Sequence, residues 1–187
     1  HSRSLAARLR EAALGPMGTL VDGVDETANL IVRSGDTARF IASVESRQAL
    51  RVGNREGMVF PAHRVSGGLV LLAELTDEQI ETLYAPERFV ERPDDRPDLA
   101  RLRRDLARVR SSGLGLNQGR SERGVVAIGR AVRDAAGRAV ACISLSMPSI
   151  RYQPIDLPRY DAALRACAEA ISASDRALAA GSAGSAG

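Results

Sequence analysis

Two pairs of extended segments, each joined by a short turn, constrain the fold of this 187-residue chain more than any other feature of its sequence. The first pair covers residues 27–33 and 37–45, with a Ser-Gly-Asp turn at 34–36. The second pair covers residues 125–132 and 139–146, with another short turn between them. Strands joined by such turns pair antiparallel. The sequence therefore predicts an antiparallel sheet that contains two hairpins.

Apolar residues at helical spacing flank and separate these hairpins. Gly15-Pro16 is expected to stop the first helix. Thr76 and Gln79 form a capping-box pattern, and Gly113 is placed to end the helix before it. We predict helices over residues 3–13, 16–23, 63–73, 98–112 and 157–178, another after Thr76, a loop over 86–97, and short strands over 49–52 and 114–118. Hairpin strands with helices packed on the faces of their sheet are typical of an α+β domain.

All 26 basic side chains are arginine, because the chain contains no lysine. Against 23 acidic residues they leave a net charge of +3 and a pI near 9.4. That margin is too small to indicate a nucleic-acid-binding surface, and the preference for arginine is typical of a GC-rich genome. The absence of lysine excludes Schiff-base and pyridoxal chemistry. No apolar stretch has the length of a membrane span, so no membrane contact is expected.

Residues able to carry catalysis or bind a metal are few. His63 is the only internal histidine, and with Cys142 and Cys167 it does not supply the ligand spacing of a zinc site. Two cysteines make no disulfide framework, which favours a reducing cytoplasm. No nucleophile elbow, phosphate-binding loop or dinucleotide fingerprint occurs. We therefore expect no enzyme activity, no metal and no cofactor.

Residues 139–146 alternate between two kinds of side chain, as the two faces of a strand do. The wholly apolar face consists of Ala141, Ile143 and Leu145. The opposite face consists of Val140, Cys142, Ser144 and Ser146. The apolar face is expected to pack against helices, whereas the two hydroxyls either bind an anionic or carbonyl ligand or face solvent. Similarly, Ser66-Gly67 begins a helix whose N–H groups either meet an anion or form an ordinary cap.

A series of short segments follows the order and spacing of a known family. The segments are FIASVES (40–46), GMVFPAH (57–63), SGG (66–68), LLA (71–73), VRSSG (109–113), ERGVVAI (122–128) and ISLSMP (143–148), with Arg151 after the last. Together they resemble the effector-binding domain of the IclR family of bacterial transcriptional regulators. The resemblance extends from about residue 3 to about residue 180.

The resemblance implies a GAF-like or profilin-like domain, with a curved antiparallel sheet flanked by helices and preceded by a linker helix. It divides the chain into a linker helix (1–15), an effector-binding domain (16–180) and a flexible tail (181–187). Family members carry an N-terminal winged helix-turn-helix that reads DNA, and a small carboxylate or aromatic acid bound to the second domain alters promoter occupancy. We therefore expect a small-molecule effector, DNA contact only through an N-terminal domain absent from these residues, and a cytoplasmic homodimer or tetramer.

The resemblance also implies the residues of a ligand site. Ser66 and Gly67 match a helix start that meets the ligand with backbone N–H groups, and Ser144 and Ser146 match hydroxyls that bind a carboxylate. Asn117 lies near a position that is often Asp in relatives. An Asn in place of that Asp removes a negative charge, so the ligand preference of those relatives does not transfer to this chain. The remaining expected lining residues are Ala127, near a position that is often Cys, and Met58 and Phe60, as an apolar wall.

Two other functions are kept as alternatives to the sensor. One is a small enzyme that uses the same cleft, which turnover of a bound compound would reveal. The other is a structural oligomerisation module with a vestigial pocket. His63 resembles a family position before the pocket helix, where a structural role is favoured over ligand contact. In some relatives a metal occupies this domain, but the residues here do not predict one.

Overall fold

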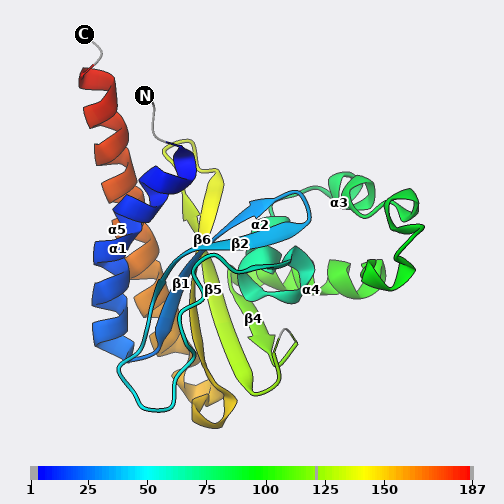
Figure 1. The fold of residues 1–187 in the computed structure, drawn as a ribbon, viewed down its shortest axis with the longest axis horizontal. Coiled ribbons are helices and arrows are strands. Elements are labelled where there is room, and N and C mark those ends of the chain that lie inside the picture. The colour runs from blue at the N-terminus through cyan, green and yellow to red at the C-terminus, as the bar shows by residue number, and fades with distance from the viewer. Residues whose placement is uncertain (1–3, 121, 186–187) are drawn as a thin grey trace.

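The computed structural model describes residues 4–120 and 122–185. Its centre is a six-stranded antiparallel sheet with strand order β3-β2-β1-β6-β5-β4, covered by helices on both faces (Figure 1). The expected α+β fold, with a curved antiparallel sheet flanked by helices, is confirmed.

Both predicted hairpins are present and meet at the centre of the sheet. The first consists of β1 (Thr27–Ser34) and β2 (Thr37–Val44), and the second of β5 (Val125–Arg133) and β6 (Ala139–Pro148). Strand β1 pairs antiparallel with β6, which joins the hairpins through their inner strands. Two strands that lie more than a hundred residues apart in the chain thereby become neighbours.

The two edge strands are short. The predicted strand over 114–118 is β4 (Gly115–Gln118), which pairs with β5. The predicted strand over 49–52 is wrong, because that segment lies in a long connection and the third strand is β3 (Val59–Pro61). Within 49–52 only Val52 is buried, whereas Leu50 is exposed. The segment therefore has no continuous apolar face to hold it against the sheet.

Helices α1 (Leu5–Val24) and α5 (Leu157–Gly184) lie side by side on one face of the sheet (Figure 1). The predicted break at Gly15-Pro16 is wrong, because α1 continues through Pro16. Its buried residues on either side of the proline form one stripe, comprising Leu9, Ala12, Ala13, Met17, Leu20 and Val21. Packing of that stripe against the core favours one helix over two, despite the hydrogen bond that a proline removes.

The long C-terminal helix extends beyond its predicted end at residue 178 to Gly184. Alanine, the strongest helix former, is frequent in this last stretch. Of the expected flexible tail, residues 181–184 thus belong to α5, and residues 186–187 lie outside the described residues. The division into linker helix, effector-binding domain and tail stays a prediction. In the described part of the chain no helix is long and apolar enough to cross a membrane.

The opposite face carries α2 (Ser66–Leu72), α3 (Asp77–Leu83) and α4 (Leu99–Ser112), with the short 3-10 helix η1 (Ala62–Arg64) before α2. The predicted capping box is confirmed: the Gln79 N–H donates to Thr76 Oγ1 at 3.1 Å, and the Thr76 N–H donates to Gln79 Oε1 at 2.9 Å. Gly113 ends α4 with φ of 74°, a left-handed conformation that favours glycine. The predicted loop over 86–97 contains only short 3-10 turns.

Two apolar cores result, one on each face of the sheet. Residues of α1 and α5 pack with Leu30, Ile143 and Leu145 in the first core. Residues of α2 and α4 pack with Ile31 and Cys142 in the second. Alternate residues of the same strand thus point into different cores.

Candidate ligand-binding site

The two faces of β6 differ as the sequence predicts, with one exception. Ala141, Ile143 and Leu145 pack in the core of α1 and α5, as expected. Val140 was expected on the serine face, but it packs against the same core as Ala141. The pairing between β5 and β6 shifts register here, with Val132 opposite Ala141 and Arg133 opposite Ala139. Val140 is the extra residue of this bulge, and a bulge interrupts the alternation of faces.

The serine face of β6 is buried rather than exposed to solvent. Ser144 is 1% exposed and Ser146 is 4% exposed, so the alternative of solvent-facing hydroxyls is wrong. Strand register places further polar residues beside them. Asn29 of β1 lies opposite Ser144 on one side and Ser43 of β2 on the other. Asn117 of β4 lies opposite Ala127, which lies opposite Ser146.

Hydrogen bonds connect part of this polar row. Ser43 Oγ donates to Asn29 Oδ1 at 2.8 Å, and Asn29 Nδ2 donates to Ser146 Oγ at 3.2 Å. Ser144 Oγ makes no hydrogen bond to another described residue. Ala127 is half-buried, although Asn117 and Ser146 on either side of it are buried. Ala127 is therefore partly open to solvent, next to hydroxyls that have unused hydrogen-bonding capacity.

Glycines bring the start of α2 onto this row. A Cβ on Gly129 would meet Cys142 Sγ at 2.7 Å and Ser66 Oγ at 3.5 Å, and a Cβ on Gly115 would meet the Ser66 carbonyl oxygen at 2.7 Å. A Cβ on Gly67 itself would meet Ile31 Cδ1 at 2.5 Å. Only glycine permits such close approach of helix and sheet. Ser66 and Gly67, predicted as site residues, thus lie over the same part of the sheet as Ser144.

Asn117 is held by backbone contacts. Its Nδ2 donates to the Arg64 carbonyl at 2.6 Å, and its Oδ1 accepts the Arg120 N–H at 2.9 Å. The amide therefore ties β4 to η1 and to the turn after β4. A carboxylate could not donate to the Arg64 carbonyl, so an asparagine at this position has a structural role.

The structure does not bring Met58 and Phe60 to the serines. Phe60 belongs to β3, and β2 and β1 lie between β3 and β6. Its ring contacts Phe40, with centroids 5.5 Å apart. Met58 is 43% exposed and precedes β3. The expected apolar wall therefore lies away from the polar row.

Sequence reasoning missed three polar residues at or beside the row: Asn29, Ser43 and Arg55. An asparagine within the apolar run of β1 was the available signal for Asn29. Arg55 is 7% exposed, its backbone N–H donates to Ser43 Oγ at 3.2 Å, and its guanidinium binds both carboxylate oxygens of Glu122 at 2.7 and 2.9 Å. Arg55 Nε is buried without a partner among the described residues. No local pattern distinguishes this buried arginine from the exposed ones.

His63 lies in η1, outside the row. Its Nδ1 is buried without a partner among the described residues, and its ring meets Tyr84 edge-on at 6.0 Å. Burial lowers the pKa of His63 below its usual value. Within the described residues, no group of three or more His, Cys, Asp or Glu side chains could hold a metal ion.

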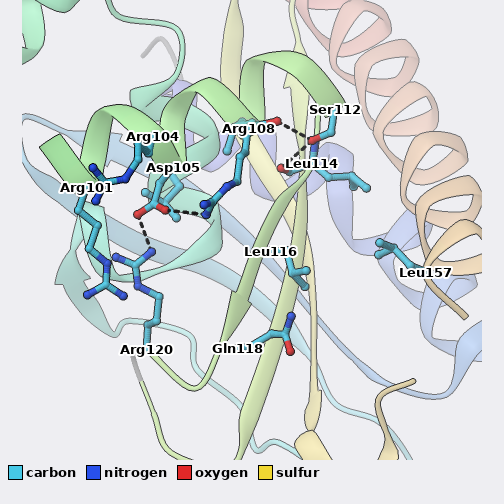
Figure 2. Close-up of a pocket in the computed structure, with 12 residues that line it drawn as sticks. Arg101, Arg104, Asp105, Arg108, Ser112, Leu114, Leu116, Gln118, Arg120 and Leu157 are labelled. Atoms are coloured by element: carbon cyan, nitrogen blue, oxygen red, sulfur yellow. Dashed lines mark hydrogen bonds and ion pairs between the residues drawn. The ribbon is translucent and has the colours of Figure 1, made fainter. Parts of the chain in front are cut away.

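A groove lies at the β4 edge of the sheet. This groove has a volume of about 630 Å³ and is bounded by α4, β4 and the start of α5 (Figure 2). None of the site residues predicted from the sequence lines it. Leu116 and Gln118 of β4 face the groove, whereas Asn117 between them is tied to η1. Neighbouring residues of β4 therefore belong to the groove and to the polar row.

Comparison with known proteins gives a consistent assignment. The family model described as "Bacterial transcriptional regulator IclR C-terminal" matches residues 4–173. The HTH-type transcriptional repressor AllR of Salmonella typhi is 33% identical over 129 residues, which cover 67% of this chain and 47% of AllR. The chain spans about half the length of the curated relatives it matches.

Solved structures share the fold. The C-terminal domain of the E. coli transcriptional regulator KdgR has a TM-score of 0.75 and 26% identity, covering 90% of this chain and 98% of that one. An IclR homolog from Microbacterium hydrocarbonoxydans, complexed with 4-hydroxybenzoate, has a TM-score of 0.75 and 26% identity, covering 93% and 70%. The relatives are named as transcriptional regulators and repressors, not as enzymes. The chain belongs to the IclR family of bacterial transcriptional regulators and contains that family's C-terminal domain.

Proposed function

We propose that the polar row on the α2 face of the sheet is an effector site for small organic carboxylates, aromatic acids included. The observation that carries this proposal is a set of buried hydroxyls, with spare hydrogen-bonding capacity, beside the half-buried Ala127. A structural relative bound to 4-hydroxybenzoate supports the ligand class. The α2 start, with Ser66 and Gly67, covers the same area.

The hydrogen-bond direction along the row suits a carboxylate. Because Asn29 donates to Ser146 Oγ, the hydroxyl proton of Ser146 is available to donate to a ligand oxygen. Ser144 has its proton available as well. Arg55, whose backbone N–H donates to Ser43, has one further Nε–H without a partner among the described residues. Donors without competing acceptors bind an ionised carboxylate more strongly than a neutral carbonyl.

An effector at this site can regulate a larger protein only if it binds one conformation of that protein with higher affinity than another. We propose that the full regulator reads DNA through a separate N-terminal domain and that effector binding to this chain changes its occupancy of the promoter. We also propose a homodimer or tetramer, because dimeric regulators match the two-fold symmetry of their operators.

Thermal unfolding with a panel of acids tests the site. We expect 4-hydroxybenzoate, benzoate or a small aliphatic acid to raise the Tm increasingly with its concentration. Ser144→Ala should abolish this shift while leaving the Tm of the free chain almost unchanged, because Ser144 Oγ has no hydrogen-bond partner among the described residues. Ser146→Ala should also abolish the shift, and it should cost about 1–3 kcal/mol because the Asn29 amide loses its acceptor.

Ser172→Ala is the matched control, since it removes a hydroxyl that donates to the Arg133 carbonyl far from the site. It should leave the ligand response intact. An unchanged response in both Ser144→Ala and Ser146→Ala would show that the ligand binds elsewhere. Conversion of the bound acid, followed by mass spectrometry, would indicate an enzyme instead. Assembly seen by sedimentation without any ligand response would indicate a structural module.

A further inference from the structure

The groove between α4 and β4 has a strongly charged end. Arg101, Arg104 and Arg108 follow one another at spacings of three and four along α4, which places them on one helix face. Arg120, from the turn after β4, points toward the same place (Figure 2). Among the described residues that line the groove, four are arginines and one, Asp105, is acidic.

The Asp105 carboxylate already forms ion pairs with two of these arginines. Asp105 is buried, and its oxygens lie 2.6 Å from Arg120 Nη1 and 3.4 Å from Arg108 Nη1. Arg101 and Arg104 have no ion pair within the part of the chain that the structure describes. Positive charges that line one groove repel one another, and an anion bound between them relieves that repulsion.

The other end of the groove is apolar. Leu114 and Leu116 from the β4 segment and Leu157 from the start of α5 line it (Figure 2). Double-stranded DNA, whose backbone presents phosphates along a convex surface, does not match such a leucine wall. A volume of about 630 Å³ is within the range of small-molecule sites.

We propose that this groove binds an amphipathic organic anion, with a phosphate, sulfonate or carboxylate headgroup at Arg101 and Arg104 and an acyl or aryl body against the leucines. The guanidinium groups supply planar, paired donors for the headgroup. Burial of the apolar body supplies the selectivity over inorganic anions. This site is separate from the effector site, because no residue of the polar row lines it and β5 lies between β4 and the strand that carries Ser144 and Ser146.

Titration calorimetry with octyl phosphate tests the proposal on the intact chain. Octyl phosphate should bind, whereas inorganic phosphate and octanol should each bind at least tenfold more weakly. Inorganic phosphate lacks the apolar chain, and octanol lacks the charged headgroup. R101Q/R104Q should weaken octyl phosphate binding at least tenfold. Both arginines are exposed, so the variant should fold as the parent does.

R39Q/R92Q is the matched control, because it removes two exposed arginines that have no ion pair among the described residues and lie outside the groove. It should bind octyl phosphate as the parent does, and so should S144A/S146A, which separates this site from the effector site. Leu116→Asn should weaken octyl phosphate binding but not inorganic phosphate binding. Equal losses in R39Q/R92Q and R101Q/R104Q, or equal affinities for octyl phosphate and inorganic phosphate, would overturn the proposal. Random duplex DNA that binds and is lost in R101Q/R104Q would also overturn it.

Discussion

At the scale of single residues, Asn117 illustrates how a buried amide can decide the chemistry of a site. Its Nδ2 donates to one backbone carbonyl and its Oδ1 accepts one backbone N–H. The first contact depends on an amide, since a carboxylate accepts hydrogen bonds but offers no donor. The position therefore serves the geometry of β4 and η1, whatever it contributes to a ligand.

Asn117→Asp tests this role. The new carboxylate would face the Arg64 carbonyl, and loss of that hydrogen bond should lower the free energy of unfolding by about 1–3 kcal/mol at pH 7. Protonation restores a donor, so the folded-state pKa of the new Asp should exceed its unfolded value near 3.9. The deficit relative to the parent should then shrink as the pH falls toward 4. Chemical denaturation at both pH values measures it, and equal stabilities at pH 7 would contradict the structural role.

The serine pair could be predicted from strand alternation alone, but other residues of the site could not. Val140 was assigned to the wrong face because a bulge cannot be seen in a pattern of period two. Asn29 and Ser43 become site residues only through the pairing of β1 with β6 and β2. That pairing joins distant segments, so no local pattern contains it. Arg55 is buried because Glu122, distant in the chain, neutralises it.

At the scale of elements, α1 shows where tertiary packing outweighs a local signal. Gly15-Pro16 favours a break, yet buried residues on both sides of it pack in one core with α5. The capping box of α3 and the Gly113 end of α4 were predictable, because each is a local arrangement of backbone and side chain. Helix ends fixed by local chemistry can thus be predicted from the sequence, whereas continuity fixed by packing cannot.

Pro16→Ala should therefore stabilise the protein. Alanine restores an N–H that can donate to the Ala12 carbonyl, and it is about 3 kcal/mol better than proline in a helix interior. We expect a gain of about 1–3 kcal/mol in the free energy of unfolding, measured by urea denaturation. Pro158→Ala is the control, because Pro158 lies in the first turn of α5, where the N–H needs no partner. A loss of stability in Pro16→Ala would contradict this account of α1.

At the scale of the whole molecule, the strand and helix order was sufficient to predict the α+β class. The order of strands in the sheet does not follow from it, because several strands could serve as the second neighbour of β1. Once β1 pairs with β6, each face of the sheet receives helices and forms its own core. The proposed effector site is centred on β1 and β6 in the middle of the sheet, whereas the charged groove lies at its β4 edge.

Each core contains one of the two cysteines. Cys142 lies in the core of α2 and α4, and Cys167 lies in the core of α1 and α5. Burial raises the pKa of Cys142 far above its usual range and that of Cys167 to about 12. Because unfolded thiols ionise near pH 8.5, the free energy of unfolding should fall as the pH rises above that value.

The chain therefore carries two natural labelling probes, one for each side of its sheet. In single variants that retain one thiol each, Cys142→Ala and Cys167→Ala, alkylation at pH 8 should be at least about 1,000-fold slower than in denaturant. A thiol that reacts at the denatured rate would show that its core is open. Cys142 Sγ lies beside Gly129, the strand partner of Ser144. An effector should therefore slow alkylation of Cys142 more than that of Cys167. The difference between the two rates would show which of the two cores opens less often when the ligand is bound.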